Sequence, residues 1–262
     1  MTDETEDRHD MRRGNFKLTI EYDGSGFHGW QRQKGCRTVQ GEIEKAIETL
    51  CGQKTALIGS GRTDAGVHAL GQVAGFTCRT RLDPATIQKA LNSLLPAEIV
   101  IRDCQPAAPG FHARFDARRK TYRYRILNRP LAAAVGRQYA WHLRRPLDLG
   151  AMRRAAAVLI GRHDFAAFEG AGSPRFHTIR QVFTACFHAE EGGDVVAFDI
   201  EADGFLRFMV RNIVGTLVLV GGEKIGVSDF AEILQSRERR RAGPTAPPQG
   251  LFLMRVSYSY SL

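Results

Sequence analysis

Hydrophobic and polar residues alternate in several short stretches of the chain, and longer stretches with helical spacing lie between them. In residues 16–22, apolar and polar side chains alternate without interruption. Such alternation predicts a strand with one buried face. From Val39 onward, apolar residues recur at every third or fourth position, and Thr38 stands immediately before them. This spacing predicts an amphipathic helix that Thr38 caps.

The same reading continues to the middle of the chain. Apolar residues at 55–58 and 72–78 predict two further strands. Asp83 followed by Pro84 is typical of a helix start, and residues 99–101 predict the next strand. The predicted order is therefore β-α-β-β-α-β, which is the order of the ferredoxin-like unit.

The second half of the chain repeats this order of elements without repeating the sequence. The Gly-containing segment 191–194 predicts a hairpin turn. The elements expected here are strands at 121–127, 182–188 and 195–200, helices at 149–160 and 205–220, a helix after Ser228, and a last strand in which Phe252, Met254, Val256, Tyr258 and Tyr260 alternate with other residues.

We therefore expect an α+β protein of two ferredoxin-like, RRM-like halves, with mainly antiparallel sheets flanked by helices. Residues 1–15 are acidic and then basic, without an apolar segment, and are expected to form a flexible tail. The N-terminal domain is expected at 16–110 and the C-terminal domain at 111–262.

The charge of the chain is basic, with 37 Lys and Arg against 28 Asp and Glu and a net charge of +9. This balance is typical of a protein that binds a polyanion such as nucleic acid, although many basic proteins bind none. No apolar run is long enough for a membrane span. The 5 cysteines are scattered without metal-ligand spacing, so neither a metal site nor a disulfide framework is expected. We expect a cytoplasmic protein.

A glycine-rich segment at 59–68 places one carboxylate, Asp64, in a predicted turn with Arg62 two residues away. An Asp in such a segment is ordinarily a turn former. Alternatively, the carboxylate is a nucleophile or a base, and Arg62 holds it ionised and orients it. Val67 and His68 stand where a phosphate-binding loop needs Lys and Ser or Thr, so no nucleotide cofactor is expected.

Two other segments are rich in cations. Residues 111–125 interleave arginines with aromatic residues, which suits an RNA backbone and its bases but equally a solvated edge strand with packed tyrosines. Tyr122 shares a strand face with apolar residues and is typical of core. The arginines at 237–241 suit either RNA or the end of a helix. The cations concerned are Arg114, Arg118, Arg119, Lys120, Arg123 and Arg125 in the first segment, and Arg237, Arg239, Arg240 and Arg241 in the second.

Arg211 lies beside the apolar stripe of the helix expected at 205–220. It is either an ordinary surface residue or an arginine that pairs with a buried carboxylate. Leu251 opens the last strand and is expected in the core.

Taken together, six segments in this order resemble the tRNA pseudouridine synthases of the A type. Phe27 and Pro248 depart from the usual family pattern, but both lie outside the main motifs. The matching segments are Glu21–Gln33 (EYDGSGFHGWQRQ), Gly61–Ala69 (GRTDAGVHA), Phe111–Phe115 (FHARF), Tyr122–Tyr124 (YRY), Met209–Gly215 (MVRNIVG) and Gly250–Leu251.

The resemblance implies isomerisation of uridine to pseudouridine at positions 38–40 in the anticodon arm of tRNA. It implies that Asp64 is the catalytic aspartate, that Tyr122 contacts the target base, and that Arg62 and Arg211 lie near the carboxylate. It places Leu251 in the pocket and the active-site cleft between the two halves. The family works as a homodimer without metal or cofactor.

Two other functions share parts of this pattern. A non-catalytic RNA-binding protein would share the charge and the fold, but it gives no reason for the segment around Asp64. A hydrolase that cleaves glycosidic bonds would use a pair of carboxylates, and no second acid stands near Asp64 in the sequence.

Overall fold

The computed structural model describes residues 12–172, 177–190 and 192–258, and the chain divides into two compact units. Unit 1 ends at Ala117 and unit 2 begins at Arg118. The sequence placed the division at residue 110, but the next residues belong to unit 1. The N–H of Ala107 donates to the carbonyl of Asn15 at 2.8 Å, and the ring of Phe111 packs over Gly75.

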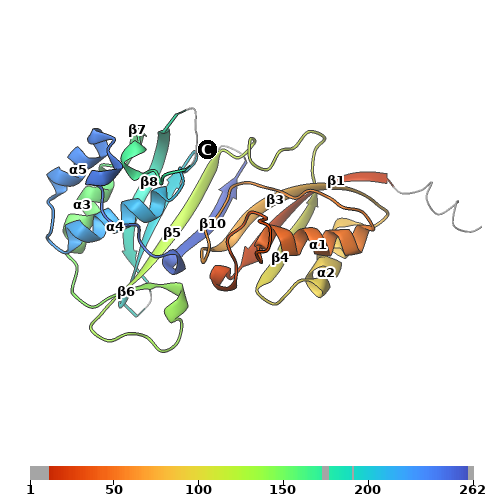
Figure 1. Cartoon of the computed structure of the whole chain (residues 1–262), viewed down its shortest axis with the longest axis horizontal. Coiled ribbons are helices and arrows are strands. Elements are labelled where there is room, and N and C mark those ends of the chain that lie inside the picture. The colour runs from red at the N-terminus through yellow and green to blue at the C-terminus, as the bar shows by residue number, and fades with distance from the viewer. Residues whose placement is uncertain (1–11, 173–176, 191, 259–262) are drawn as a thin grey trace, which may run out of the picture. The chain divides into compact units, whose positions relative to one another are not determined.

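Unit 1 is an antiparallel sheet in the order β4-β1-β3-β2 with two helices (Figure 1). Its element order is the predicted β-α-β-β-α-β, with one short 3-10 helix added after the first strand. The elements are β1 (Arg12–Tyr22), the 3-10 helix Gly24–Gly26, α1 (Val39–Cys51), β2 (Ile58–Gly59), β3 (His68–Thr80), α2 (Pro84–Leu94) and β4 (Ile99–Pro106).

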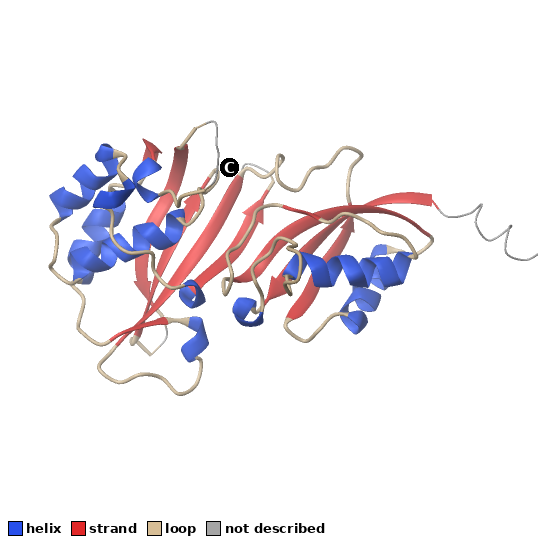
Figure 2. Ribbon diagram, viewed as in Figure 1, coloured by secondary structure: helices blue, strands red, loops and turns tan. Residues whose placement is uncertain are grey.

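Both helices of unit 1 begin at the expected caps. The side chain of Thr38 accepts the N–H of Gly41, and Asp83 accepts the N–H groups of Ala85 and Thr86. The apolar stripes of α1 and α2 lie against one face of the strands (Figure 2). On that face the rings of Phe16 and Phe76 stack with centroids 5.2 Å apart, at a directly paired position of β1 and β3.

Three strands of unit 1 are longer than the hydrophobic pattern predicted, and one of them is β4, which was expected at 99–101 and runs to Pro106. β1 begins at Arg12, so residues 12–15 are strand and not part of a flexible tail; residues 1–11 lie outside the described part of the chain. β3 begins at His68 and not at Gln72. The backbone ladder between β1 and β3 causes the extensions of these two strands, because it continues through polar and glycine residues that the alternation of side chains does not mark.

Unit 2 repeats the arrangement of unit 1. Its sheet has the order β10-β5-β9-β8-β7, and the first four strands correspond to β4-β1-β3-β2 of unit 1. The predicted repeat of element order is therefore matched by a repeat of sheet order. The elements are β5 (Arg119–Asn128), β6 (Trp141–Leu143), α3 (Leu149–Ala157), β7 (Gly161–Asp164), β8 (Ile179–Ala189), β9 (Val195–Ala202), α4 (Met209–Gly221), α5 (Val227–Ser236) and β10 (Leu251–Ser257), with 3-10 helices at Arg137–Tyr139, Ala166–Phe168, Arg239–Arg241 and Pro248–Gly250.

Unit 2 contains two short strands that the pattern did not predict, β6 and β7, and most of its other elements have bounds that differ by a few residues. The helix expected from residue 205 begins at Met209, because Phe208 takes a left-handed conformation with φ of 60° and interrupts the helical backbone. In β10 the pairing with β5 shifts between Leu253 and Arg255. This bulge places Leu251, Leu253 and Val256 in the core, so the alternation expected from Phe252 holds only in part, and Tyr260 lies outside the described residues.

The segment before β10 packs tightly on α4. A Cβ atom on Gly215 would collide with the carbonyl oxygen of Pro244. The fully buried side chain of Asn212 accepts hydrogen bonds from Arg239 at 3.0 Å and from Thr245 at 2.6 Å. Gly215 and Asn212 therefore fix the course of residues 243–246 across the helix.

Within the described ranges, no helix is both long and apolar enough to cross a membrane.

Replacing Gly215 with alanine tests this packing. We expect Gly215→Ala to lower the free energy of unfolding by about 1–3 kcal/mol, because overpacking against a backbone carbonyl outweighs the gain in helix propensity. Gly150→Ala in α3 is the control, since the nearest atom to a Cβ there is a side-chain oxygen of the capping residue Asp148, 3.1 Å away, and not a backbone carbonyl. Urea unfolding measures the free energy of unfolding of both variants. An unchanged value for Gly215→Ala would show that residues 243–246 do not pack closely on α4.

Candidate active site

Asp64 lies half-buried in the turn between β2 and β3 of unit 1. The turn is anchored at its start by Gln72, whose side chain is fully buried. Gln72 accepts the hydroxyl of Ser60 at 2.7 Å and donates to the carbonyl of Gly61 at 3.0 Å. At its end, the N–H of Val67 donates to the carbonyl of Asp64 at 3.2 Å. The backbone on both sides of the carboxylate is thus fixed.

A second segment, the 23–30 loop that follows β1, holds the turn from the side. The N–H of Trp30 donates to the carbonyl of Thr63 at 3.0 Å, and the hydroxyls of Thr63 and Tyr22 share a hydrogen bond of 2.8 Å. Gly29 has a φ of 85°, and a Cβ atom there would lie 2.6 Å from the carbonyl oxygen of Thr63. Only glycine permits this approach without displacement.

The 23–30 loop also contacts the start of β3. His68, 1% exposed, accepts the N–H of Gly24 on Nδ1 at 3.1 Å. Asp23 Oδ1 lies 3.1 Å from the same nitrogen, so a proton on Nδ1 would redirect His68 from Gly24 to Asp23. Either bond ties the loop to β3.

The hydroxyl of Tyr22 is neutral in this environment. Burial raises the pKa of Tyr22 well above its ordinary value, and the hydrogen bonds with Thr63 and Gln72 offset only part of that effect. Tyr22 therefore supports the turn by packing and hydrogen bonding, and it is not a source of charge beside Asp64. The sequence analysis assigned no role to Tyr22, Thr63 or Trp30, although all three stand inside the matched segments.

Arg62 does not fulfil the expected role of orienting Asp64. Its side chain is exposed, and it forms no hydrogen bond or ion pair with any residue that the structure describes. The expected contact is absent because the side chains of two residues that stand two positions apart on a turn need not point toward each other. What holds the Asp64 backbone is the 23–30 loop and Gln72.

The other candidate residues belong to unit 2. Tyr122 on β5 is 7% exposed, and its ring packs edge-on against Phe205 with centroids 5.0 Å apart. Leu251 on β10 is likewise buried. Both side chains therefore lie in the core of unit 2, as the hydrophobic pattern predicted.

Arg211 lies in the first turn of α4 and is partly buried. Its Nε donates to the carbonyl of Ala246 at 2.7 Å, and the N–H of Ala246 donates back to the carbonyl of Arg211 at 3.0 Å. The guanidinium carbon lies 5.1 Å from the centroid of the Phe208 ring. Arg211 is therefore a positioned arginine and not an ordinary surface residue.

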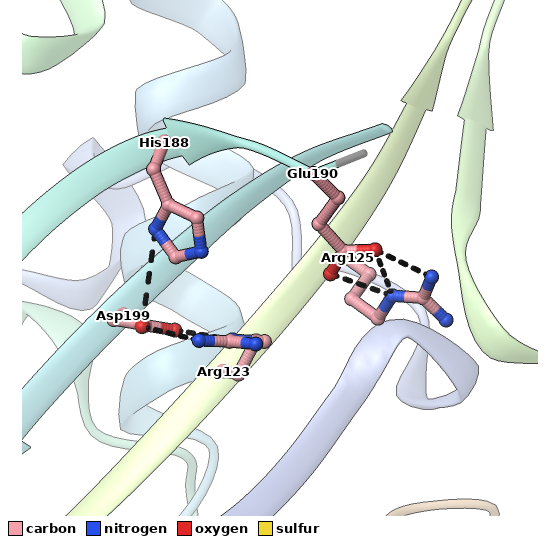
Figure 3. Close-up of polar contacts among 5 residues, drawn as sticks. All are labelled: Arg123, Arg125, His188, Glu190 and Asp199. Carbon is pink, nitrogen blue, oxygen red and sulfur yellow. Dashed lines mark hydrogen bonds and ion pairs between the residues drawn. The ribbon is translucent and has the colours of Figure 1, made fainter. Parts of the chain in front are cut away.

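Arg119, Arg123 and Arg125 form ion pairs on one face of the unit 2 sheet. Arg123 donates two bonds of 2.8 Å to Asp199, and Arg125 donates to Glu190 at 2.6 Å (Figure 3). The carboxylate raises the pKa of Arg123, and His188 Nδ1 lies 3.9 Å from Asp199 (Figure 3).

Further along β5, Arg119 donates to Glu201 at 3.0 Å, and Thr121 and Arg255 donate to the same carboxylate. Carboxylates within unit 2 already balance the charges of Arg119, Arg123 and Arg125, which favours a structural role for these three arginines over binding of RNA phosphates.

The second basic cluster is also engaged within unit 2. Arg239 donates to Asn212, Thr245 and the carbonyls of Ala242 and Gly243, and burial lowers its pKa. Arg237, Arg240 and Arg241 form ion pairs with Asp164, Glu238 and Glu232, respectively. Arg239 is thus a structural residue, which pattern alone did not distinguish from its neighbours.

In the part of the chain that the structure describes, no group of three or more His, Cys, Asp or Glu side chains is arranged to hold a metal ion.

The chain matches the family model described as tRNA pseudouridine synthase over residues 18–116 and 155–259. These ranges include the Asp64 turn, the 23–30 loop and the helix with Arg211, whereas β5 with Tyr122 lies between them. The chain belongs to the tRNA pseudouridine synthase family.

Relatives similar to this family member over nearly their full length bear the name tRNA pseudouridine synthase A. The protein from Moorella thermoacetica is 48% identical over 244 residues, covering 92% of this chain and 98% of the relative. That from Thermoanaerobacter sp. (strain X514) is 46% identical over 244 residues, covering 93% and 99%. That from Geobacter sp. (strain M21) is 45% identical over 245 residues, covering 93% and 98%.

The Glu201 cluster makes the stability of this pseudouridine synthase family member depend on pH. Burial alone would raise the pKa of Glu201, but the hydrogen bonds from Arg119, Thr121 and Arg255 outweigh it and hold the pKa below its ordinary value of 4.5. A carboxylate with a lowered pKa stabilises the fold above its unfolded pKa, and this stabilisation is lost as the pH falls.

We expect Glu201→Gln to lower the free energy of unfolding at pH 7 by about 1–3 kcal/mol, as for hydrogen bonds to a charged group. The difference between the two proteins should shrink as the pH falls from 4.5, the unfolded pKa, through the lower folded pKa, where the wild-type carboxylate also becomes protonated in the folded protein. Denaturant unfolding at pH 7 and in acid measures it. A difference that stays constant with pH would contradict this assignment.

Proposed function

We propose that this protein isomerises uridine to pseudouridine at positions 38–40 in the anticodon arm of tRNA, with Asp64 as its catalytic residue. The observation that carries the proposal is the fixed turn around Asp64. The 23–30 loop and Gln72 immobilise the backbone on both sides of a half-buried carboxylate. Membership of the tRNA pseudouridine synthase family supports the reaction, and the names of the relatives support the substrate.

The reaction suits a single positioned carboxylate. The bond between N1 of uracil and C1′ of the sugar breaks, the base turns, and C5 bonds to C1′. The proton leaves C5 and N1 gains one, so the atoms and the redox state balance. Asp64 acts either as the nucleophile at C1′ or as the base that removes the 2′ proton of the sugar, and both routes need the carboxylate ionised and held in place.

The proposed roles of the unit 2 residues follow from their surroundings. The ring of Tyr122 lies nearly perpendicular to the ring of Phe205, and we assign Tyr122 to contact with the target base. Arg211, held by Ala246, is assigned to the catalytic carboxylate, and Leu251 to the wall of the pocket. These groups and Asp64 are assigned to one target uridine. A base inside a stem must be extruded at a cost of a few kcal/mol, which contacts to the RNA backbone offset.

The remaining features of the proposal rest on the family resemblance. The protein acts as a homodimer with tRNA across both subunits, in the cytoplasm, and needs neither metal nor cofactor. Arg62, exposed on the Asp64 turn, is assigned to the RNA substrate because its charge is not balanced by a described side chain.

Tritium release from C5-labelled uridine in bulk tRNA tests the proposed reaction. We expect release by the wild type and a loss of at least about 1000-fold in Asp64→Asn, because the amide is neither a nucleophile nor a base at neutral pH. Asp103→Asn is the matched control, since it makes the same carboxylate-to-amide change in β4 of unit 1 and should keep full activity.

Binding of tRNA by Asp64→Asn should be unchanged. Absence of release by the wild type with tRNA still bound would favour a non-catalytic RNA-binding protein, whereas free uracil among the products would favour a hydrolase.

Arg62 and Arg211 should separate effects on activity from effects on stability. Arg62→Ala should change the free energy of unfolding by less than about 0.5 kcal/mol, as for an exposed residue without contacts, yet lower kcat/KM. Arg211→Ala should lower both, since it also loses the hydrogen bond to Ala246, worth about 1 kcal/mol. Thermal unfolding measures the effect on stability, and tritium release by the same preparations measures the effect on activity. Full activity of Arg62→Ala would contradict the assignment of Arg62 to the substrate.

A further inference from the structure

Unit 1 has a pocket of about 670 Å³ that does not include Asp64 among its lining residues. The start of β1, the segment between α1 and β2, the middle of β3 and the segment after β4 surround it. Its volume is in the range of pockets that bind small molecules. The proposed reaction leaves this pocket without a role.

The charge of the pocket is positive. Arg13 and Lys54 line it, and none of the described residues that line it is acidic. Both side chains are exposed, and neither forms an ion pair with a described residue. They differ in this from Arg119, Arg123 and Arg125 of unit 2, whose charges are balanced by carboxylates. Two cations that no described carboxylate balances, at one pocket, attract an anion.

Of the other residues that line the pocket, some are polar and some are apolar. Asn15 accepts the hydroxyl of Thr77 at 2.7 Å, so these two side chains form a fixed polar edge. Phe111 lies over Gly75, where a Cβ atom would sit 3.5 Å from its ring, and Ile58 is 44% exposed. Apolar surface beside cations matches a ligand that carries both a flat base and a phosphate.

We infer that this pocket binds a nucleotide of the RNA substrate other than the target uridine, with its phosphate at Arg13 and Lys54 and its base against Phe111 and Ile58. The inference rests on the proposed function, because that function supplies the RNA.

The distance between the pocket and Asp64 is short enough for both to contact the same arm of one RNA. Ile58 stands six residues before Asp64, and an extended chain spans at most about 3.6 Å per residue, so the two Cα atoms are at most ~22 Å apart. At about 3.4 Å per stacked nucleotide, this is no more than roughly six nucleotides.

Charge reversal at the pocket tests the inference. The variants are Arg13→Glu and Lys54→Glu, and the matched control is Lys89→Glu on α2, an exposed lysine of unit 1 outside the pocket. The Kd for bulk tRNA is measured over a range of salt concentrations. We expect each pocket variant to weaken binding and to reduce the slope of log Kd against log salt by about 0.7 to 0.9, the value for one phosphate contact. Lys89→Glu should leave the slope unchanged.

The neutral variants Arg13→Gln and Lys54→Gln guard against misfolding, and both should keep the wild-type Tm while reducing the slope. Equal slopes for the pocket variants and Lys89→Glu would overturn the inference. Tritium release by the wild type separates this failure from failure of the proposed function: release with equal slopes rejects the pocket alone. Reduced slopes without release would support an RNA site in the pocket and reject the isomerase.

Discussion

The close contact between the 23–30 loop and the Asp64 turn is the constraint on which the rest of unit 1 depends. A backbone hydrogen bond from Trp30 to Thr63 joins them, and it forms only because Gly29 has no side chain to separate the two segments. The turn could otherwise move with the mobility usual for surface loops. Instead, its position is set by residues next to β1 and by Gln72 of β3, so the sheet itself orients the carboxylate.

Much of the fold was accessible from the sequence, because local signals and the sheet agree. The caps at Thr38 and Asp83 and the order of elements in unit 1 were predicted correctly, whereas in unit 2 the short strands β6 and β7 were missed. Strand ends were not, because backbone pairing extends β1 and β3 beyond the apolar alternation. The bulge in β10 was also missed, since a single unpaired residue shifts which side chains face the core and leaves no mark in the pattern.

For the candidate site, the sequence indicated which segments matter but not how their side chains are connected. Arg62 next to Asp64 suggested an ion pair that the turn does not form. The arginines of β5 suggested a surface for RNA, and the structure shows that cross-strand carboxylates on β9 balance two of them. Those carboxylates are 76 and 82 residues away along the chain, so no local pattern could have revealed them. Long-range pairing is what distinguishes a structural arginine from one that is available to a ligand.

The two units share one sheet order but differ in the length of the connection between corresponding strands. In unit 1, residues 60–67 connect β2 to β3 and carry Asp64; in unit 2, the corresponding strands β8 and β9 are separated only by residues 190–194. The connection in unit 1 is therefore longer and carries the candidate carboxylate, whereas the connection in unit 2 is shorter. A duplicated scaffold can thus specialise through the length of a single connection, while the strands on either side keep their order.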